Sequence, residues 1–206
     1  MPWSEQAAAR AVDEIFERRV PPLQTLVGDA ERVARACHAM ATRFHAGGKL
    51  IVFGNGGPST DAQHVAVEFV HPVIVGKKAL PAISLTADVA TVTGVATGDG
   101  PDEVFAHQVR HLADPEDIAL GISTDGNCGN VLRGLAVAGD RSLLTVGLTG
   151  GDGGRIARAG LDHVLIADAV DPRVVKEAHV TMYHVLWELV HVFFEHPGAL
   201  RQGVGA

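Results

Sequence analysis

The sequence predicts an α/β protein with a five-stranded parallel, doubly wound sheet flanked by helices and preceded by an N-terminal helical extension. Five short apolar runs alternate with segments long enough to form crossover helices, which is the pattern of a parallel sheet. Glycine-rich turns follow three of these runs, as expected where a strand leads into a helix. The 206 residues are predicted to form one domain, with N-terminal helices over 1–47, an α/β core over 48–196 and a frayed tail over 197–206.

The N-terminal extension is predicted to contain two helices. Apolar residues recur at helical spacing over about 3–19, and the Pro21–Pro22 pair is expected to end this first helix. A second helical pattern runs from Leu23 to the Gly47–Gly48 pair, a glycine signal for a helix C-terminus. Both helices therefore precede the first strand.

The predicted strands are apolar runs typical of strands that are covered on both faces. They span residues 50–53, 82–85, 118–122, 143–148 and 163–167. Helices are predicted over about 59–72, 88–96, 102–112, 127–139, 153–159 and 172–195. In doubly wound sheets, ligands bind beyond the carboxyl ends of the strands, near the point where the strand order reverses. The turns that follow the strands are therefore the candidate binding sites.

Composition excludes several classes of partner. The net charge is -7 and no run is rich in Lys or Arg, so neither a nucleic acid nor an anionic membrane is expected as the main partner. There is no apolar run of about 18 residues that could span a membrane. The N-terminus lacks the apolar core of a signal peptide. Cys37 and Cys128 lie far apart without a CxxC spacing, which favours a reducing, cytoplasmic location.

The turn after the first predicted strand has the sequence GNGGPST. Gly56 and Gly57 permit positive φ angles and allow backbone N–H groups to face an anion at a helix N-terminus, with Asn55 and Ser59 beside them. A phosphate group suits such a turn. The alternative is a tight turn capped by Ser59 or Thr60 that binds no ligand.

The turn after the third predicted strand is also rich in hydroxyl and amide groups. Ser123, Thr124, Asp125 and Asn127 are candidate ligand-binding residues at its entry into a helix. Simple capping by Asp125 or Asn127 is the alternative, and the Asp125 carboxylate would repel a phosphate. A third turn, TGGDGG, follows the fourth strand and is predicted to be structural.

Candidate metal ligands and proton carriers occur on two predicted helices. Asp61, His64 and Glu68 are spaced three and four residues apart and therefore share one helix face. A His and a Glu at this spacing can chelate one divalent ion, although such pairs are also common as solvated side chains. His184 lies on the long closing helix, which is apolar on several sides, so its polar residues need partners.

Motifs along most of the chain resemble, in order, those of the phosphoheptose isomerases, which belong to the sugar-isomerase (SIS) domain family. They are GNGG with Asp61, His64 and Glu68; GIST with Gly126 and Asn127; LTG with DGG; and Glu177 with His179 and His184. The resemblance covers about residues 30–195. It implies a Rossmann-like SIS fold, a homotetramer or homodimer assembled through the N-terminal helices, and conversion of sedoheptulose 7-phosphate to a heptose 7-phosphate.

The resemblance also implies roles for single residues. By this resemblance His64, Glu68 and His184 bind zinc, and Glu68 and His184 are the base and acid of an aldose–ketose proton transfer. Such a transfer through an enediol needs a base, an acid and a group that polarises the carbonyl. Ser123 and Thr124 are implied to anchor the phosphate of the substrate.

Lys176 stands where the family has a glutamine as fourth metal ligand, and a protonated ammonium group has no lone pair to donate. One alternative is zinc bound by three protein ligands. The other is a metal-free site in which Lys176 replaces the metal, either by pairing with Glu68 or by acting as the electrophile with a lowered pKa. Pro58, Asp125 and Cys128 stand where the family has serines in the two turns. The alternative to an isomerase is therefore a non-catalytic SIS module that binds a phosphosugar or a protein partner, with Lys176 among its binding residues.

Overall fold

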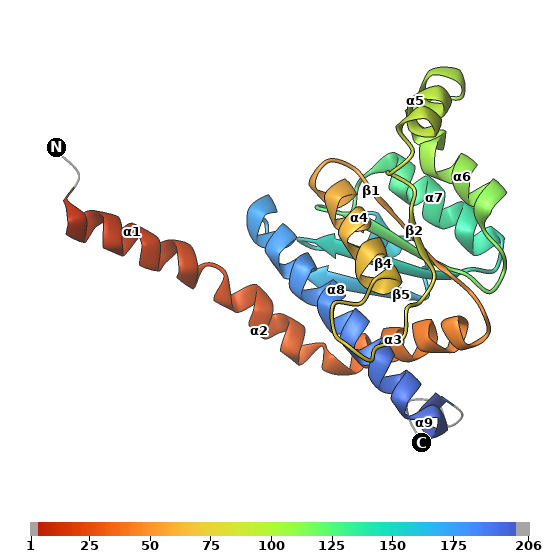
Figure 1. Cartoon of the computed structure of the whole chain (residues 1–206). Coiled ribbons are helices and arrows are strands. Elements are labelled where there is room, and N and C mark those ends of the chain that lie inside the picture. Colours follow the sequence, from red (N-terminus) through yellow and green to blue (C-terminus); the bar gives the residue numbers. More distant parts are fainter. Residues whose placement is uncertain (1–3, 201–206) are drawn as a thin grey trace.

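All five predicted strands form one parallel sheet in the computed structural model, which describes residues 4–200 (Figure 1). The strands are β1 (Leu50–Gly54), β2 (Ala82–Ser84), β3 (Ile118–Ser123), β4 (Leu144–Gly150) and β5 (His163–Ala167). Their order across the sheet is β2-β1-β3-β4-β5, and every neighbouring pair is parallel. The order reverses between β1 and β3, so the turns after these two strands flank the topological switch point.

Helices cover both faces of the sheet, which confirms the doubly wound fold class (Figure 1). One layer contains α3 (Ala30–His45), α4 (Gly57–Val70) and α8 (Pro172–Glu195), and the other contains α5 (Val89–Gly98), α6 (Val104–Leu112) and α7 (Gly129–Asp140). Alternate residues of β1 explain the two cores: Leu50 and Val52 pack with the first layer, whereas Ile51 and Phe53 pack with the second. Because β1 is covered on both faces, its run is continuously apolar.

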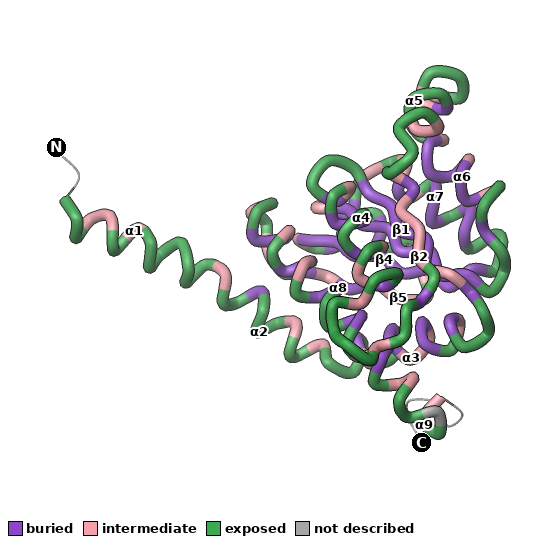
Figure 2. The backbone as a smooth tube through the Cα atoms, in the orientation of Figure 1, coloured by how far each residue is buried: buried purple, intermediate pink, exposed green. Residues whose placement is uncertain are grey.

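The N-terminal extension differs from the predicted pair of helices. It consists of α1 (Glu5–Glu17) and α2 (Val20–Gly28), and α3 follows after Asp29. The Pro21–Pro22 pair therefore opens α2 rather than only ending α1, because proline in a first helical turn has a suitable φ and lacks an N–H that would find no partner there. Helix α1 extends away from the sheet and has no buried residue, whereas α2 contacts α8 and β5 and buries Pro22 (Figures 1 and 2).

Two further predictions about helices need correction. The segment 153–159 forms only a short 3₁₀ helix, Ile156–Arg158, since Gly153 and Gly154 adopt positive φ angles that an α-helix cannot contain. A second 3₁₀ turn, Pro101–Glu103, precedes α6. Within the predicted tail, Pro197–Leu200 forms the short helix α9, while Trp3 and residues 201–206 lie outside the described residues. In the described part of the chain, no helix combines the length and apolar character needed to cross a membrane.

Candidate active site

The turns after β1 and β3 meet at the switch point of the sheet. The side-chain amide of Asn55 donates a hydrogen bond to Asn130 Oδ1 at 2.6 Å and lies 2.9 Å from the sulfur of Cys128. Gly56 has a φ of 64° at the N-cap of α4, a conformation that strongly favours glycine. The N-termini of α4 and α7 are thereby held next to each other, which provides two sets of backbone N–H groups for an anion.

The hydroxyl groups of Ser59 and Ser123 bond within their own turns. Ser59 Oγ donates to the Gly56 carbonyl at 2.7 Å, and Ser123, which is only 3 % exposed, accepts from the Gly126 N–H at 3.1 Å. Asp125 accepts from the backbone N–H of Asn127 at 2.9 Å. This bond is the main reason why the pKa of Asp125 lies below its usual value. The hydrogen bonds of its own turn therefore stabilise the charged form of Asp125.

The segment around the third glycine-rich turn forms hydrogen bonds to the second turn, in agreement with the structural role predicted for the third turn. Ile156 N–H donates to the Gly126 carbonyl at 3.0 Å, and Arg155 N–H donates to Asn127 Oδ1 at 3.2 Å. A Cβ atom on Gly126 would lie 2.0 Å from the Gly153 carbonyl oxygen. Gly126 is therefore required by the close approach of two backbones, and Asn127 has a structural partner.

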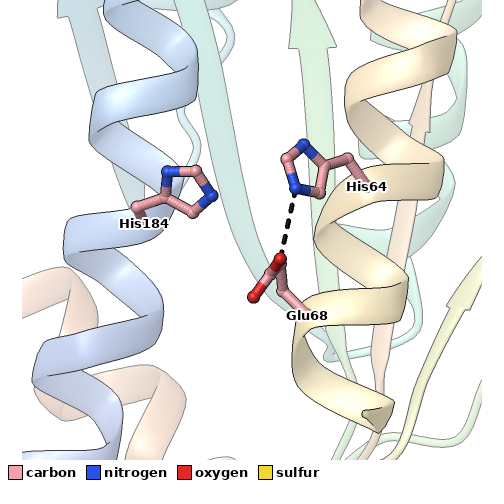
Figure 3. Close-up of side chains that lie close together, drawn as sticks. All are labelled: His64, Glu68 and His184. Carbon is pink, nitrogen blue, oxygen red and sulfur yellow. Dashed lines mark hydrogen bonds and ion pairs between the residues drawn. The ribbon is translucent and has the colours of Figure 1, made fainter. Parts of the chain in front are cut away.

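His64, Glu68 and His184 come together between α4 and α8. Each offers a ligand atom, and these atoms all lie within 4.8 Å of one another. His184 projects from α8 toward the two side chains of α4 (Figure 3). His64 Nε2 lies 3.2 Å from Glu68 Oε1, and the rings of His64 and His184 have centroids 5.3 Å apart. The side chain of His64 is 43 % exposed and that of Glu68 is 15 % exposed, so a solute can reach this cluster.

Two buried aromatic residues of α8 support the cluster from behind. The Tyr183 hydroxyl lies 2.9 Å from His64 Nδ1, and the Trp187 indole donates to the Glu68 carbonyl oxygen at 2.9 Å. Burial, followed by the nearby charges of Asp61 and Glu68, raises the pKa of Tyr183 well above its usual value, so the hydroxyl remains protonated. Tyr183 was missed in the sequence, although a single tyrosine in an apolar helix stripe signals a hydroxyl that needs a partner.

Lys176 does not pair with Glu68. Its ammonium group bonds to Asp61 Oδ1 at 2.6 Å, to the Gly57 carbonyl at 3.1 Å and to the Thr60 hydroxyl at 3.1 Å. The predicted Lys176–Glu68 ion pair is therefore wrong, because the first turn of α4 offers Lys176 one carboxylate and two further acceptors. The Lys176 side chain is 41 % exposed, while that of Asp61 is only 4 % exposed.

The chemistry of the cluster fits zinc. Two imidazoles and one carboxylate are a known ligand set for catalytic zinc, which keeps one position open for water or substrate. In this chain the three ligand atoms lie close together: His184 of α8 approaches His64 and Glu68 of α4. Lys176 donates three hydrogen bonds elsewhere and supplies no ligand. His64, Glu68 and His184 would therefore hold the ion as a three-residue set.

Comparisons with known proteins agree with this fold and show the family of the chain. The family model described as "SIS domain" matches residues 21–150. The chain is 41 % identical over 181 residues to the phosphoheptose isomerase of Pelobacter propionicus, covering 88 % of this chain and 90 % of that protein. It is 38 % identical over 193 residues to the phosphoheptose isomerase of Solidesulfovibrio magneticus, covering 93 % and 94 %. The solved structure of the phosphoheptose isomerase from Neisseria gonorrhoeae superimposes with a TM-score of 0.82 at 31 % identity, covering 89 % of this chain and 98 % of that one.

A five-stranded parallel sheet with paired glycine turns at its switch point and the matching family model define an SIS-domain protein. Relatives that match almost from end to end narrow this class further. The chain belongs to the phosphoheptose isomerase family.

Proposed function

We propose that this protein is a sugar-phosphate isomerase that interconverts sedoheptulose 7-phosphate and an aldoheptose 7-phosphate. The observation that carries the proposal is the His64–Glu68–His184 cluster in a chain whose relatives are named phosphoheptose isomerases. The cluster combines a carboxylate and imidazoles, the groups most suited to moving protons near neutral pH.

Glu68 is the proposed base. Its side chain is mostly buried but has one face toward the open cluster, so it can take a proton from one sugar carbon and return it to the neighbouring carbon. His184 is exposed on the facing helix, and we assign to it the proton exchange at the sugar oxygens. Zinc, when bound by His64, Glu68 and His184, would supply polarisation of the substrate carbonyl. Moving the proton within one site avoids its loss to water.

The phosphate end of the substrate is proposed to bind at the switch point. Its candidate contacts are Asn55, Gly56, Gly57 and Ser59 in the first turn, and Ser123, Thr124, Asp125 and Asn127 in the second. Lys176 is a further candidate contact, because its ammonium group bonds to the Gly57 carbonyl and therefore lies beside the first turn. Binding at the phosphate would orient the reacting end of the sugar against α4 and α8.

The test is to incubate purified protein with sedoheptulose 7-phosphate and a panel of other ketose phosphates, before and after zinc loading, and to follow aldose formation by NMR. We expect turnover of sedoheptulose 7-phosphate, with zinc raising the rate. Binding of the phosphosugars without turnover in either form would contradict the proposal and favour the non-catalytic SIS module.

We further propose that the chain forms a homotetramer through α1 and α2, with a homodimer as the alternative. Exposed apolar side chains on these helices support self-association, including Phe16 at 66 % and Val27 at 76 % exposure. Sedimentation analysis is expected to give four times the chain mass, and Phe16→Glu is expected to reduce it. Val170→Glu, at a site that is 92 % exposed in the loop before α8, serves as the matched control. A parent protein that sediments as a monomer would contradict this assembly.

A further inference from the structure

Tyr183 is the only tyrosine of the chain, and it is buried between α8 and α4 with 2 % exposure. Its hydroxyl lies 2.9 Å from His64 Nδ1. Its ring meets those of His64 and His184 edge-on, at centroid distances of 5.4 Å and 4.9 Å. Tyr183 is thus packed against two members of the proposed metal-binding cluster without being able to reach substrate from the surface.

The two nitrogens of His64 face different partners. Nδ1 faces the Tyr183 hydroxyl, and Nε2 faces Glu68 Oε1 at 3.2 Å. A neutral imidazole carries one hydrogen, so one nitrogen donates and the other accepts. An ionised carboxylate only accepts hydrogen bonds. In a neutral, metal-free His64 the hydrogen therefore belongs on Nε2, where it bonds to Glu68, and Nδ1 accepts from the Tyr183 hydroxyl.

A metal held by His64 Nε2 requires the opposite arrangement. The Nε2 lone pair must then point at the ion, so the ring hydrogen moves to Nδ1 and needs an acceptor. The Tyr183 oxygen is that acceptor, because a hydroxyl group both donates and accepts and its hydrogen can rotate. A backbone carbonyl or a carboxylate at the same place could support only the second arrangement.

We propose that Tyr183 is a positioning residue that holds the His64 ring in one orientation in both of its tautomers, by donating to Nδ1 without metal and accepting from it with metal. The inference rests on the proposed metal-binding role of His64, Glu68 and His184. Its consequence is that the cluster gains and loses an ion without repacking of α4 against α8. The ring is already directed at Glu68 when the ion arrives, which lowers the cost of forming the site.

The tautomer of His64 can be observed directly. Protein labelled with ¹⁵N-histidine is titrated with zinc in the absence of substrate, and long-range ¹H–¹⁵N spectra are recorded, with a His64→Gln variant used to assign the His64 signals. We expect the Nε2–H tautomer before zinc and the Nδ1–H tautomer after it. A parent protein whose His64 signals keep the same tautomer throughout the titration, or do not respond to zinc, overturns the inference without any variant.

The Tyr183→Phe variant removes only the hydroxyl. We expect its zinc dissociation constant, measured by competition with a chromophoric chelator, to rise about 10- to 100-fold, the usual effect of removing the partner of a ligating histidine. Its metal-free His64 is expected to keep the Nε2–H tautomer, because Glu68 still accepts from Nε2. A zinc affinity within about twofold of the parent overturns the inference.

Trp187→Phe is the matched control, because it removes another polar contact from α8 to α4, the bond to the Glu68 carbonyl, and leaves the His64 ring partners in place. We expect this variant to lose stability but to keep the tautomer change and most of the zinc affinity. Equal losses of zinc affinity in both variants would assign Tyr183 a packing role only and overturn the inference. None of these measurements uses the sugar substrate, so an isomerase without the tautomer change contradicts only this inference, and a tautomer change without turnover contradicts only the proposed function.

Discussion

Asp61 and Glu68 both project from α4 toward α8, but they meet different partners there. At the Asp61 end of the contact between α4 and α8, the Lys176 ammonium group pairs with the Asp61 carboxylate. It donates its remaining hydrogens to the Gly57 carbonyl and the Thr60 hydroxyl. At the Glu68 end, the carboxylate faces His64 within a cluster that also contains His184. At the first end the chain supplies its own cation for the carboxylate, whereas the second end has the composition of a site that binds a metal ion.

The difference shows how one pair of helices can hold a structural and a chemical carboxylate two turns apart. Asp61 is buried, and its Oδ2 has no hydrogen-bond partner within the described part of the chain, so its charge depends on Lys176. Glu68 keeps 15 % of its side chain exposed and bonds to an imidazole. A carboxylate with a permanent ammonium partner is a poor base, and one beside an imidazole is free to exchange protons.

The largest effect is expected from Glu68→Gln, which keeps the shape of the side chain but removes the proposed base. We expect kcat for sedoheptulose 7-phosphate to fall about 10²- to 10⁴-fold, the usual contribution of a general base. Rates are measured by NMR, and circular dichroism checks the fold. Glu116→Gln makes the same charge change at an exposed position before β3 and is expected to keep the parent rate. Turnover near the parent rate in Glu68→Gln would remove this residue from the chemistry.

A smaller effect on stability is expected from Lys176→Met, which leaves the Asp61 carboxylate buried without its cation. We expect the free energy of unfolding to fall by about 1–3 kcal/mol, the range for an uncompensated buried polar group, since Lys176 itself is partly solvated. Urea unfolding at one fixed protein concentration gives this value. Lys176→Arg keeps the charge and should recover part of the loss. If Lys176→Met is as stable as the parent, the Asp61 end does not depend on its ion pair.

The smallest effect concerns His179, which is 1 % exposed in α8. Burial is the main cause that lowers the pKa of His179 below the ordinary value of 6.5, and the Lys176 charge also lowers it. The hydrogen bond with the Thr149 backbone and the Asp61 charge raise this pKa, but by less. Below pH 6.5, His179 therefore binds a proton in the unfolded chain more readily than in the folded chain. Its contribution lowers the free energy of unfolding as the pH falls below 6.5. Urea midpoints measured from about pH 8 to 5 should decline less in His179→Gln than in the parent. Parallel curves would show that His179 does not contribute to the acid sensitivity.

Most of the fold could be predicted from the sequence because its signals are local. Continuous apolar runs identified all five strands, and the glycine turns marked the ends of β1, β3 and β4. The predictions failed where a signal has two meanings. The Pro21–Pro22 pair can end one helix or begin the next, and here it begins α2.

The sequence by itself determined the sheet, the switch-point turns and the pairing of His64 with Glu68, because strand periodicity, turn chemistry and the four-residue helical spacing all act between near neighbours. Tertiary structure decided that Lys176 bonds to Asp61 and that Tyr183 bonds to His64. These contacts join residues 115 and 119 positions apart in the chain. They depend on the position of α8 along α4 and on its rotation about its own axis. Both are set by the packing of the two helices on the sheet rather than by any local sequence pattern.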